Sequence, residues 1–143
     1  GSAGMDPAGA RAEAEKEMVA SMRRDQALYE NIFNTEAAGP EARRLQSVLQ
    51  RAMSEPGVIA ARHQPESTRI ECKNTQCRVT AVFAPSQDPS EWSTRLAIAA
   101  VSHFASNRQL GSEEPGGGVS RVLYFYPQSV DPRLRDPVRG ITR

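Results

Sequence analysis

The sequence of 143 residues contains few of the side chains from which most catalytic and metal-binding sites are built. It has two cysteines, Cys72 and Cys77, and two histidines, His63 and His103. A single C-x4-C pair does not supply the four ligands of a structural zinc site. The spacing of the polar residues indicates no Ser/His/Asp set and no carboxylate pair. We therefore expect no catalytic residues, no metal site and no cofactor, with His63 in a solvated loop and His103 in a partly buried structural position.

Long apolar segments and a strong net charge are also missing. No run of about 18 apolar residues occurs, so we expect no transmembrane segment. The formal net charge is +1, which gives the chain no overall field to attract nucleic acid or anionic lipid. Hydrophobic residues make up 38% of the sequence, below the average of globular domains, so part of the chain is expected to lie outside the core.

The strongest local pattern lies in residues 67–84, where apolar and polar side chains alternate on both sides of a polar tetrapeptide. Such alternation predicts two antiparallel strands joined by a tight hairpin over residues 73–76. One register pairs three sets of chemically compatible residues: Cys72 with Cys77, Glu71 with Arg78, and Ile70 with Val79. Both cysteines then lie on the apolar face, and an acid lies opposite a base on the polar face.

That register also allows a disulfide. Opposed residues of an antiparallel pair lie about 4.5–5.5 Å apart at Cα, within the range of about 4.4–6.8 Å that a disulfide accepts. A disulfide that closes so short a loop is expected to stabilise the folded protein by roughly 2 kcal/mol. The alternative is two reduced cysteines packed as small hydrophobic residues. A redox or thiol-dependent role for Cys72 or Cys77 requires an exposed thiolate of low pKa, whereas strand alternation turns Lys73 and Arg78 to the other face.

The hairpin carries a resemblance. Over residues 30–106 the chain resembles an uncharacterised domain of many exported proteins of Gram-negative bacteria, and residues 34–53 are similar to the helix that precedes the hairpin there. The shared motif is E-C-[KR]-x-x-x-C-R-[VI], matched here by Glu71, Cys72, Lys73, Cys77, Arg78 and Val79, with lysine where arginine is usual. The resemblance implies a location that is periplasmic or otherwise extracytoplasmic and an oxidised cysteine pair, and it implies no activity.

Helical patterns precede the hairpin. Residues 6–17 favour helix by composition but have no apolar stripe. A stripe begins further on, with Met18, Met22, Tyr29 and Phe33 at helical spacing. It predicts a helix that packs on its own domain or, alternatively, one that forms a homodimer or binds a partner. A second amphipathic helix follows Pro40 and ends near residue 56, with apolar residues at Leu45, Val48, Leu49 and Ala52.

A third helix is expected over residues 89–107. Asp88, Pro89 and Glu91 fit the N-cap, N1 and N3 positions of a capping box. The segment from Trp92 to Phe104 is apolar over a wide arc, which is typical of a central helix buried beneath a sheet. Residues 112–118 are expected to form a flexible loop, and Val119–Tyr126 an outer strand.

These elements predict an α+β fold in the order α-α-β-β-α-β, with a small antiparallel sheet of three to four strands packed on the central helix. We interpret residues 1–5 as a remnant of cloning that replaces an export signal. Residues 6–29 are expected to form a helical arm, 30–127 a single domain and 128–143 a loose tail.

The expected function is that of a non-enzymatic extracytoplasmic module that binds a protein partner. Inhibitor, immunity-type and secretion accessory proteins all fit this description, and the sequence does not choose between them. The expected partner surface is an exposed stripe of Val122, Tyr124 and Tyr126, with Arg121, Glu113 and Glu114 as its polar rim. The competing hypothesis is that the N-terminal helix covers this stripe through Tyr29 and Phe33.

Overall fold

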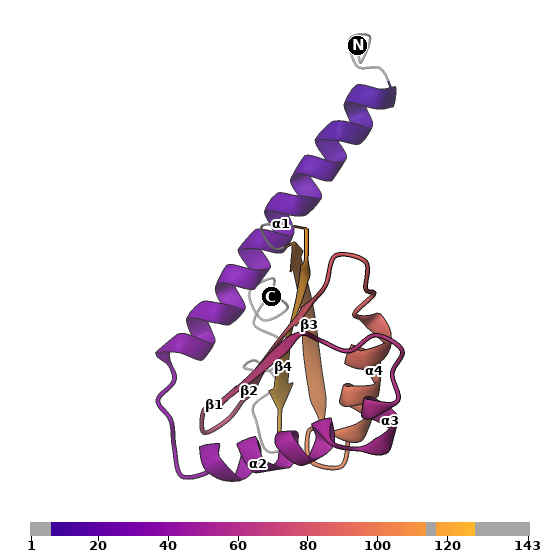
Figure 1. The fold of residues 1–143 in the computed structure, drawn as a ribbon. Helices are drawn as coiled ribbons and strands as arrows, with labels where there is room; N and C mark the ends of the chain where they lie inside the picture. Colours follow the sequence, from indigo (N-terminus) through magenta and orange to yellow (C-terminus); the bar gives the residue numbers. More distant parts are fainter. Residues whose placement is uncertain (1–6, 114–116, 128–143) are drawn as a thin grey trace.

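The computed structural model describes residues 7–113 and 117–127 of the chain. In these residues it has four helices and four strands, arranged as one antiparallel sheet with the strand order β1-β2-β4-β3. The helices are α1 (Pro7–Thr35), α2 (Ala42–Met53), α3 (Pro56–Ile59) and α4 (Ser90–Ala99). The strands are β1 (Ser67–Cys72), β2 (Cys77–Phe83), β3 (Ser106–Glu113) and β4 (Val119–Tyr126). The predicted α+β class with a small antiparallel sheet is confirmed (Figure 1).

The hairpin of β1 and β2 has the predicted register. Cys72 is paired with Cys77 and joined to it by a disulfide, and their Cα atoms are 4.0 Å apart. Glu71 faces Arg78 and accepts a 3.0 Å hydrogen bond from its guanidinium. The alternation of apolar and polar residues therefore fixed both the pairing and the face of each strand.

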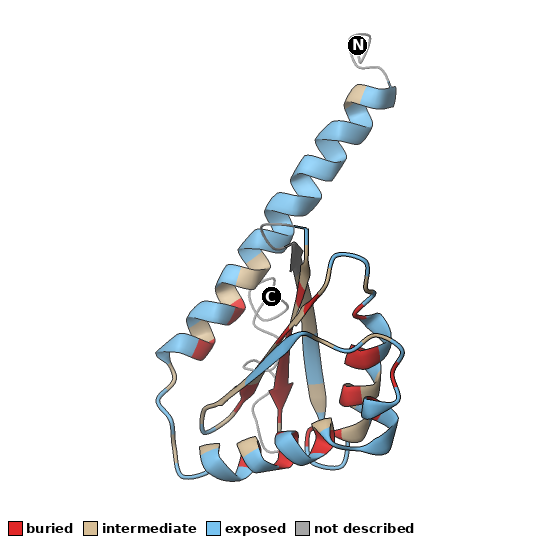
Figure 2. Ribbon diagram, in the orientation of Figure 1, coloured by how far each residue is buried: buried red, intermediate tan, exposed pale blue. Residues whose placement is uncertain are grey.

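One face of the sheet packs against α2, α3 and α4 (Figure 2). Strand β2 alternates strictly, so that Cys77, Val79, Ala81 and Phe83 are all fully buried on this side. The helices contribute Leu45, Val48, Leu49, Ala52, Val58, Trp92 and Leu96 to the same core. Trp92 and Phe104 are only 2% and 3% exposed, which confirms their predicted place beneath the sheet.

The other face of the sheet is covered by the second half of α1. Tyr29 stacks on Tyr124 of β4 with ring centroids 5.6 Å apart, and Phe33 contacts the same ring edge-on at 6.1 Å. The first half of α1 extends past the end of the sheet, away from the domain (Figure 1). The helix runs through residue 30 without a break, so the arm and the covering helix are one element.

Two expectations about the C-terminal half were wrong. The helix expected over residues 89–107 ends at Ala99, and β3 occupies part of that segment and the beginning of the expected loop. Strand β4 is an inner strand, paired with β2 on one side and with all eight residues of β3 on the other. The sequence of β3, SNRQLGSE, has weak strand propensity, and its pairing with the strongly apolar β4 outweighs that preference. With the short helix α3 included, the order becomes α-α-α-β-β-α-β-β.

Candidate functional site

The tyrosines expected to face a partner lie inside the protein. Tyr124 is fully buried and Tyr126 is 2% exposed, and together with Val122 they form a second apolar cluster with Tyr29 and Phe33. The expectation of an exposed stripe is wrong because α1 packs over it, as the competing hypothesis held. A run of apolar residues without alternation, as in Val122–Tyr126, is itself the sign of a strand buried on both faces.

The expected polar rim does not assemble around that stripe. Arg121 alternates with Val122 along β4 and therefore points to the opposite face. Its guanidinium lies close to Gly111 of β3, the residue with which Arg121 is paired. Glu113 is the last residue of β3 and pairs with Val119, while Glu114 lies outside the described residues.

The disulfide is packed into the fold rather than presented at a surface. Cys77 is fully buried in the main core, and Cys72 is half-buried at its margin. A thiol-dependent reaction requires an accessible thiolate. The geometry of this pair therefore offers a structural crosslink and gives no support to the redox alternative.

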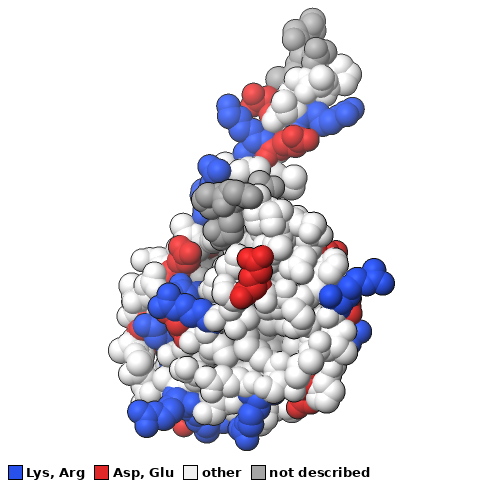
Figure 3. Space-filling model, viewed as in Figure 1, with Lys and Arg blue, Asp and Glu red and all other residues white. Residues whose placement is uncertain are grey.

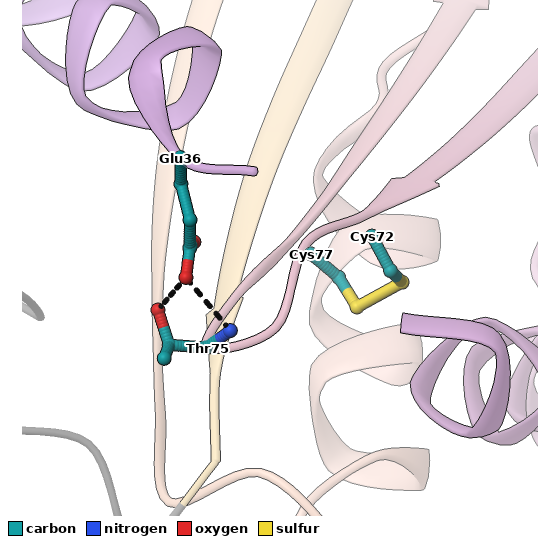
Figure 4. Close-up of a disulfide and its surroundings, with 4 residues drawn as sticks. All are labelled: Glu36, Cys72, Thr75 and Cys77. Atoms are coloured by element: carbon teal, nitrogen blue, oxygen red, sulfur yellow. Dashed lines mark hydrogen bonds between the residues drawn. A yellow bond between two sulfur atoms is a disulfide. The ribbon is translucent and has the colours of Figure 1, made fainter. Parts of the chain in front are cut away.

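The tip of the hairpin is tied to the end of α1. The Glu36 carboxylate accepts hydrogen bonds from the Thr75 amide at 3.0 Å, the Thr75 hydroxyl at 2.6 Å and the Gln76 side-chain amide at 3.1 Å (Figure 4). The Asn74 side chain accepts a bond from the Glu41 amide and lies so close to Gly39 that a side chain there would overlap it. No sequence pattern pointed to these contacts, since they join residues more than 30 positions apart.

Charged groups on the hairpin also meet α1. The Arg78 guanidinium lies 4.3 Å from the centre of the Phe33 ring, a cation–π distance, while it donates to Glu71. Burial lowers the pKa of Arg78, but Glu71 and the neighbouring Tyr124 together raise it by more, so the pKa lies above its ordinary value. Burial raises the pKa of the Tyr124 hydroxyl, and Arg78 offsets this in part. These contacts anchor the second half of α1 to the sheet.

Two grooves run beside α1 where it crosses the sheet. The groove over β1 and β2 has a volume of about 530 Å³ and carries Glu30, Glu71 and Arg78 on its walls. The other has a volume of about 1040 Å³ and lies between α1 and strands β3 and β4. Its walls include Val19, Met22, Arg23, Gln26, Leu110 and Val119. We call this second, more apolar hollow the arm groove.

At the arm groove and one turn beyond it, α1 exposes large apolar side chains. Met18 is 59%, Val19 45% and Met22 50% exposed. Met22 lies seven residues before Tyr29, two helical turns away, and so shares the face with which Tyr29 packs on the sheet. The apolar face of α1 thus continues past the end of the sheet into a part of the helix that no other described residue buries. We call Met18, Val19 and Met22 the arm face.

The two histidines lie in different surroundings. His63 accepts a hydrogen bond from the Asp88 amide at 2.8 Å, and His103 is exposed rather than partly buried as expected. Among the described residues, no His, Cys, Asp or Glu cluster of metal-binding size occurs. In the same part of the chain, no helix is both long and apolar enough to cross a membrane.

The chain matches no known family model, no curated protein and no solved structure. The fold and its surfaces are therefore the basis for the functional argument. They define a two-sided α+β domain with a disulfide hairpin, from which one amphipathic helix extends.

Proposed function

We propose that this protein is a non-catalytic, extracytoplasmic module that binds another protein chain through the arm face and the arm groove. The observation that carries the proposal is the continuity of the apolar face of α1. Its second half is buried on the sheet through Tyr29 and Phe33, and its first half presents the arm face to solvent. Apolar side chains gathered on one helix face, next to an apolar groove, are typical of a protein-binding surface.

The proposed location rests on the disulfide. Disulfides persist in oxidising compartments such as the periplasm and are reduced in most cytosols. We expect that alkylation of freshly lysed cells in denaturant without reductant, which exposes the buried Cys77, leaves Cys72 and Cys77 unmodified, with mass spectrometry as the measurement. Two alkylated cysteines would place the folded protein in a reducing compartment and would remove this part of the proposal.

The binding role is tested by photo-crosslinking in the cell. A photoreactive amino acid at Met22 is expected to crosslink to a protein, which mass spectrometry then identifies. The matched control is the same residue at Ala20, which is exposed on the opposite side of α1. Equal crosslinking at both positions, or none at Met22, contradicts the proposal. The identity of the captured protein distinguishes an inhibitor of a toxin or lytic enzyme from a secretion accessory subunit.

A further inference from the structure

We infer that the protein bound by the arm face is a second copy of this chain, whose α1 lies antiparallel to the first. The inference rests on the proposed binding role of the arm face and names its partner. It is carried by the distribution of charge around Met18 and by the shape of the arm groove.

The charges on α1 are arranged so that the helix is complementary to itself when one copy is reversed. Arg11 lies seven residues before Met18, and Asp25 lies seven residues after it. When the two copies of Met18 face each other, each Arg11 therefore comes opposite Asp25 of the second copy. Both residues lie on the side of α1 that carries the arm face, because each is two helical turns from Met18.

A second pair of charges agrees with the same arrangement. Glu15 lies within the apolar stripe, one turn before Met18, and comes opposite Ser21 of the second copy, two residues or about 3 Å along the helix from Arg23. Arg23 lines the arm groove and so points toward this side of the helix. Among the described residues, Arg11, Glu15, Arg23 and Asp25 form no ion pair within the chain. Figure 3 shows acidic and basic side chains interleaved on the projecting part of the molecule.

A parallel arrangement lacks this complementarity. With both helices running the same way, Arg11 faces Arg11 and Asp25 faces Asp25. Like charges at adjacent positions are destabilising, whereas opposite charges favour one orientation over the other. The charge pattern therefore selects the antiparallel pair.

The arm groove fits the first half of the second helix. Its α1 walls lie between Val19 and Gln26, and in the antiparallel arrangement these residues come opposite residues 10–17 of the other copy. Leu110 of β3 and Val119 of β4 complete the groove. Residues 10–17 include small side chains such as Ala10 and Ala14, which can approach the edge of a sheet closely. Each copy would fill the groove of the other, so the contact closes on itself as a two-fold dimer.

The inference is tested with the full chain by sedimentation equilibrium. We expect a dimer that Arg11→Glu and Asp25→Arg each weaken about tenfold in Kd, because each reversal creates two like-charge contacts. The double variant Arg11→Glu/Asp25→Arg is expected to restore the wild-type Kd. Arg24→Glu is the matched control, because Arg24 lies on the opposite side of α1 and its reversal is expected to leave Kd unchanged. Circular dichroism checks that each variant is folded.

Orientation is tested by cysteine crosslinking. Copies with Arg11→Cys mixed with copies carrying Asp25→Cys are expected to form a mixed disulfide dimer, while neither variant crosslinks to itself. Three results would each overturn the inference: a chain that is monomeric at every concentration tested, a Kd that neither charge reversal changes, or a disulfide between two Arg11→Cys copies. A monomeric chain whose Met22 still captures a different protein in cells overturns only this inference and leaves the proposed function standing. A monomeric chain whose Met22 captures nothing overturns both.

Discussion

At the scale of residues, two of the three tyrosines in the cluster between α1 and the sheet pack on each other and are hydrogen-bonded differently. Tyr29 and Tyr124 stack on each other. The Tyr29 hydroxyl accepts a 3.1 Å bond from the Arg108 guanidinium, whereas the buried Tyr124 hydroxyl lies near the Arg78 guanidinium but makes no hydrogen bond of full geometry among the described residues. Burying an unpaired hydroxyl is unfavourable, so removing the two hydroxyls should have different consequences.

We expect Tyr29→Phe to lower the free energy of unfolding by about 1 kcal/mol, the usual net value of one hydrogen bond. Tyr124→Phe keeps the ring and removes only the unpaired hydroxyl, so it should change stability by less than about 0.5 kcal/mol or increase it. Urea denaturation of the two variants provides the comparison. A larger loss for Tyr124→Phe than for Tyr29→Phe would mean that Arg78 bonds the Tyr124 hydroxyl after all.

A second prediction at this scale concerns pH. The Asp88 carboxylate accepts a 2.9 Å bond from the Ser90 amide at the start of α4, which lowers its pKa, with smaller contributions from Arg121 and His63. A carboxyl whose pKa is lower in the folded than in the unfolded protein adds stability above its unfolded pKa of about 3.9, and this is lost as the pH falls through the folded pKa. Asp88→Asn keeps a capping oxygen and removes the titration.

The stability difference between wild type and Asp88→Asn should therefore be constant near neutral pH and shrink as the pH falls below about 4. Unfolding free energies measured by urea denaturation over this range give the difference directly. Two curves that stay parallel down to the acid limit would show that the charge of Asp88 contributes nothing.

At the scale of elements, sequence patterns predicted the parts whose contacts are local. The hairpin follows from alternation around residues 73–76, and α2 follows from its apolar spacing. The end of α4 could not be predicted from sequence patterns, because residues 100–113 contain no strong stop signal before Gly111. Strand β3 could not be predicted either, because its residues form a strand only by pairing with β4. The arm face was visible in the sequence as Met18 and Met22, but the arm groove was not, since its walls come from α1, β3 and β4.

Helix α4 offers a direct test of which of its faces is buried. Trp92 packs edge-on against Phe83 at 5.8 Å and is 2% exposed, so Trp92→Ala should cost about 3–5 kcal/mol of stability. Ile98 on the same helix is 65% exposed, and Ile98→Ala should change stability by no more than about 0.5 kcal/mol. Denaturant melts that rank the two variants the other way would contradict the orientation of α4.

The junction between α1 and the hairpin gives another prediction. Glu36→Ala leaves the Thr75 amide and the buried Gln76 side chain without their acceptor, so it should lower the unfolding free energy by about 1–3 kcal/mol. Glu41→Ala removes an exposed carboxylate paired with Arg44 and should cost less than about 1 kcal/mol. Equal losses in chemical denaturation would show that Glu36 does not hold α1 to the hairpin.

At the scale of the whole molecule, α1 has two halves that differ in their contacts. The second half supplies Tyr29 and Phe33, which cover one face of the sheet, while the first half carries the arm face and contributes nothing to either core. Stability and association should therefore depend on different parts of one continuous helix. A dimer of the kind inferred above would add to the apparent stability of the full chain by mass action, so the two properties must be measured separately.

Deletion of residues 1–22 should thus leave the unfolding free energy of the monomer within about 1 kcal/mol of the wild-type value, because none of the side chains that the structure describes in residues 7–22 is buried. The same deletion should abolish self-association, since it removes the arm face. Phe33→Ala is the opposite case, expected to cost about 3–5 kcal/mol of stability while the arm face stays intact. Both variants are compared with wild type by urea denaturation at protein concentrations below the Kd, and by sedimentation at concentrations above it. If the deletion destabilises the monomer as strongly as Phe33→Ala, then the first half of α1 is part of the fold, and the arm face is not a surface reserved for binding.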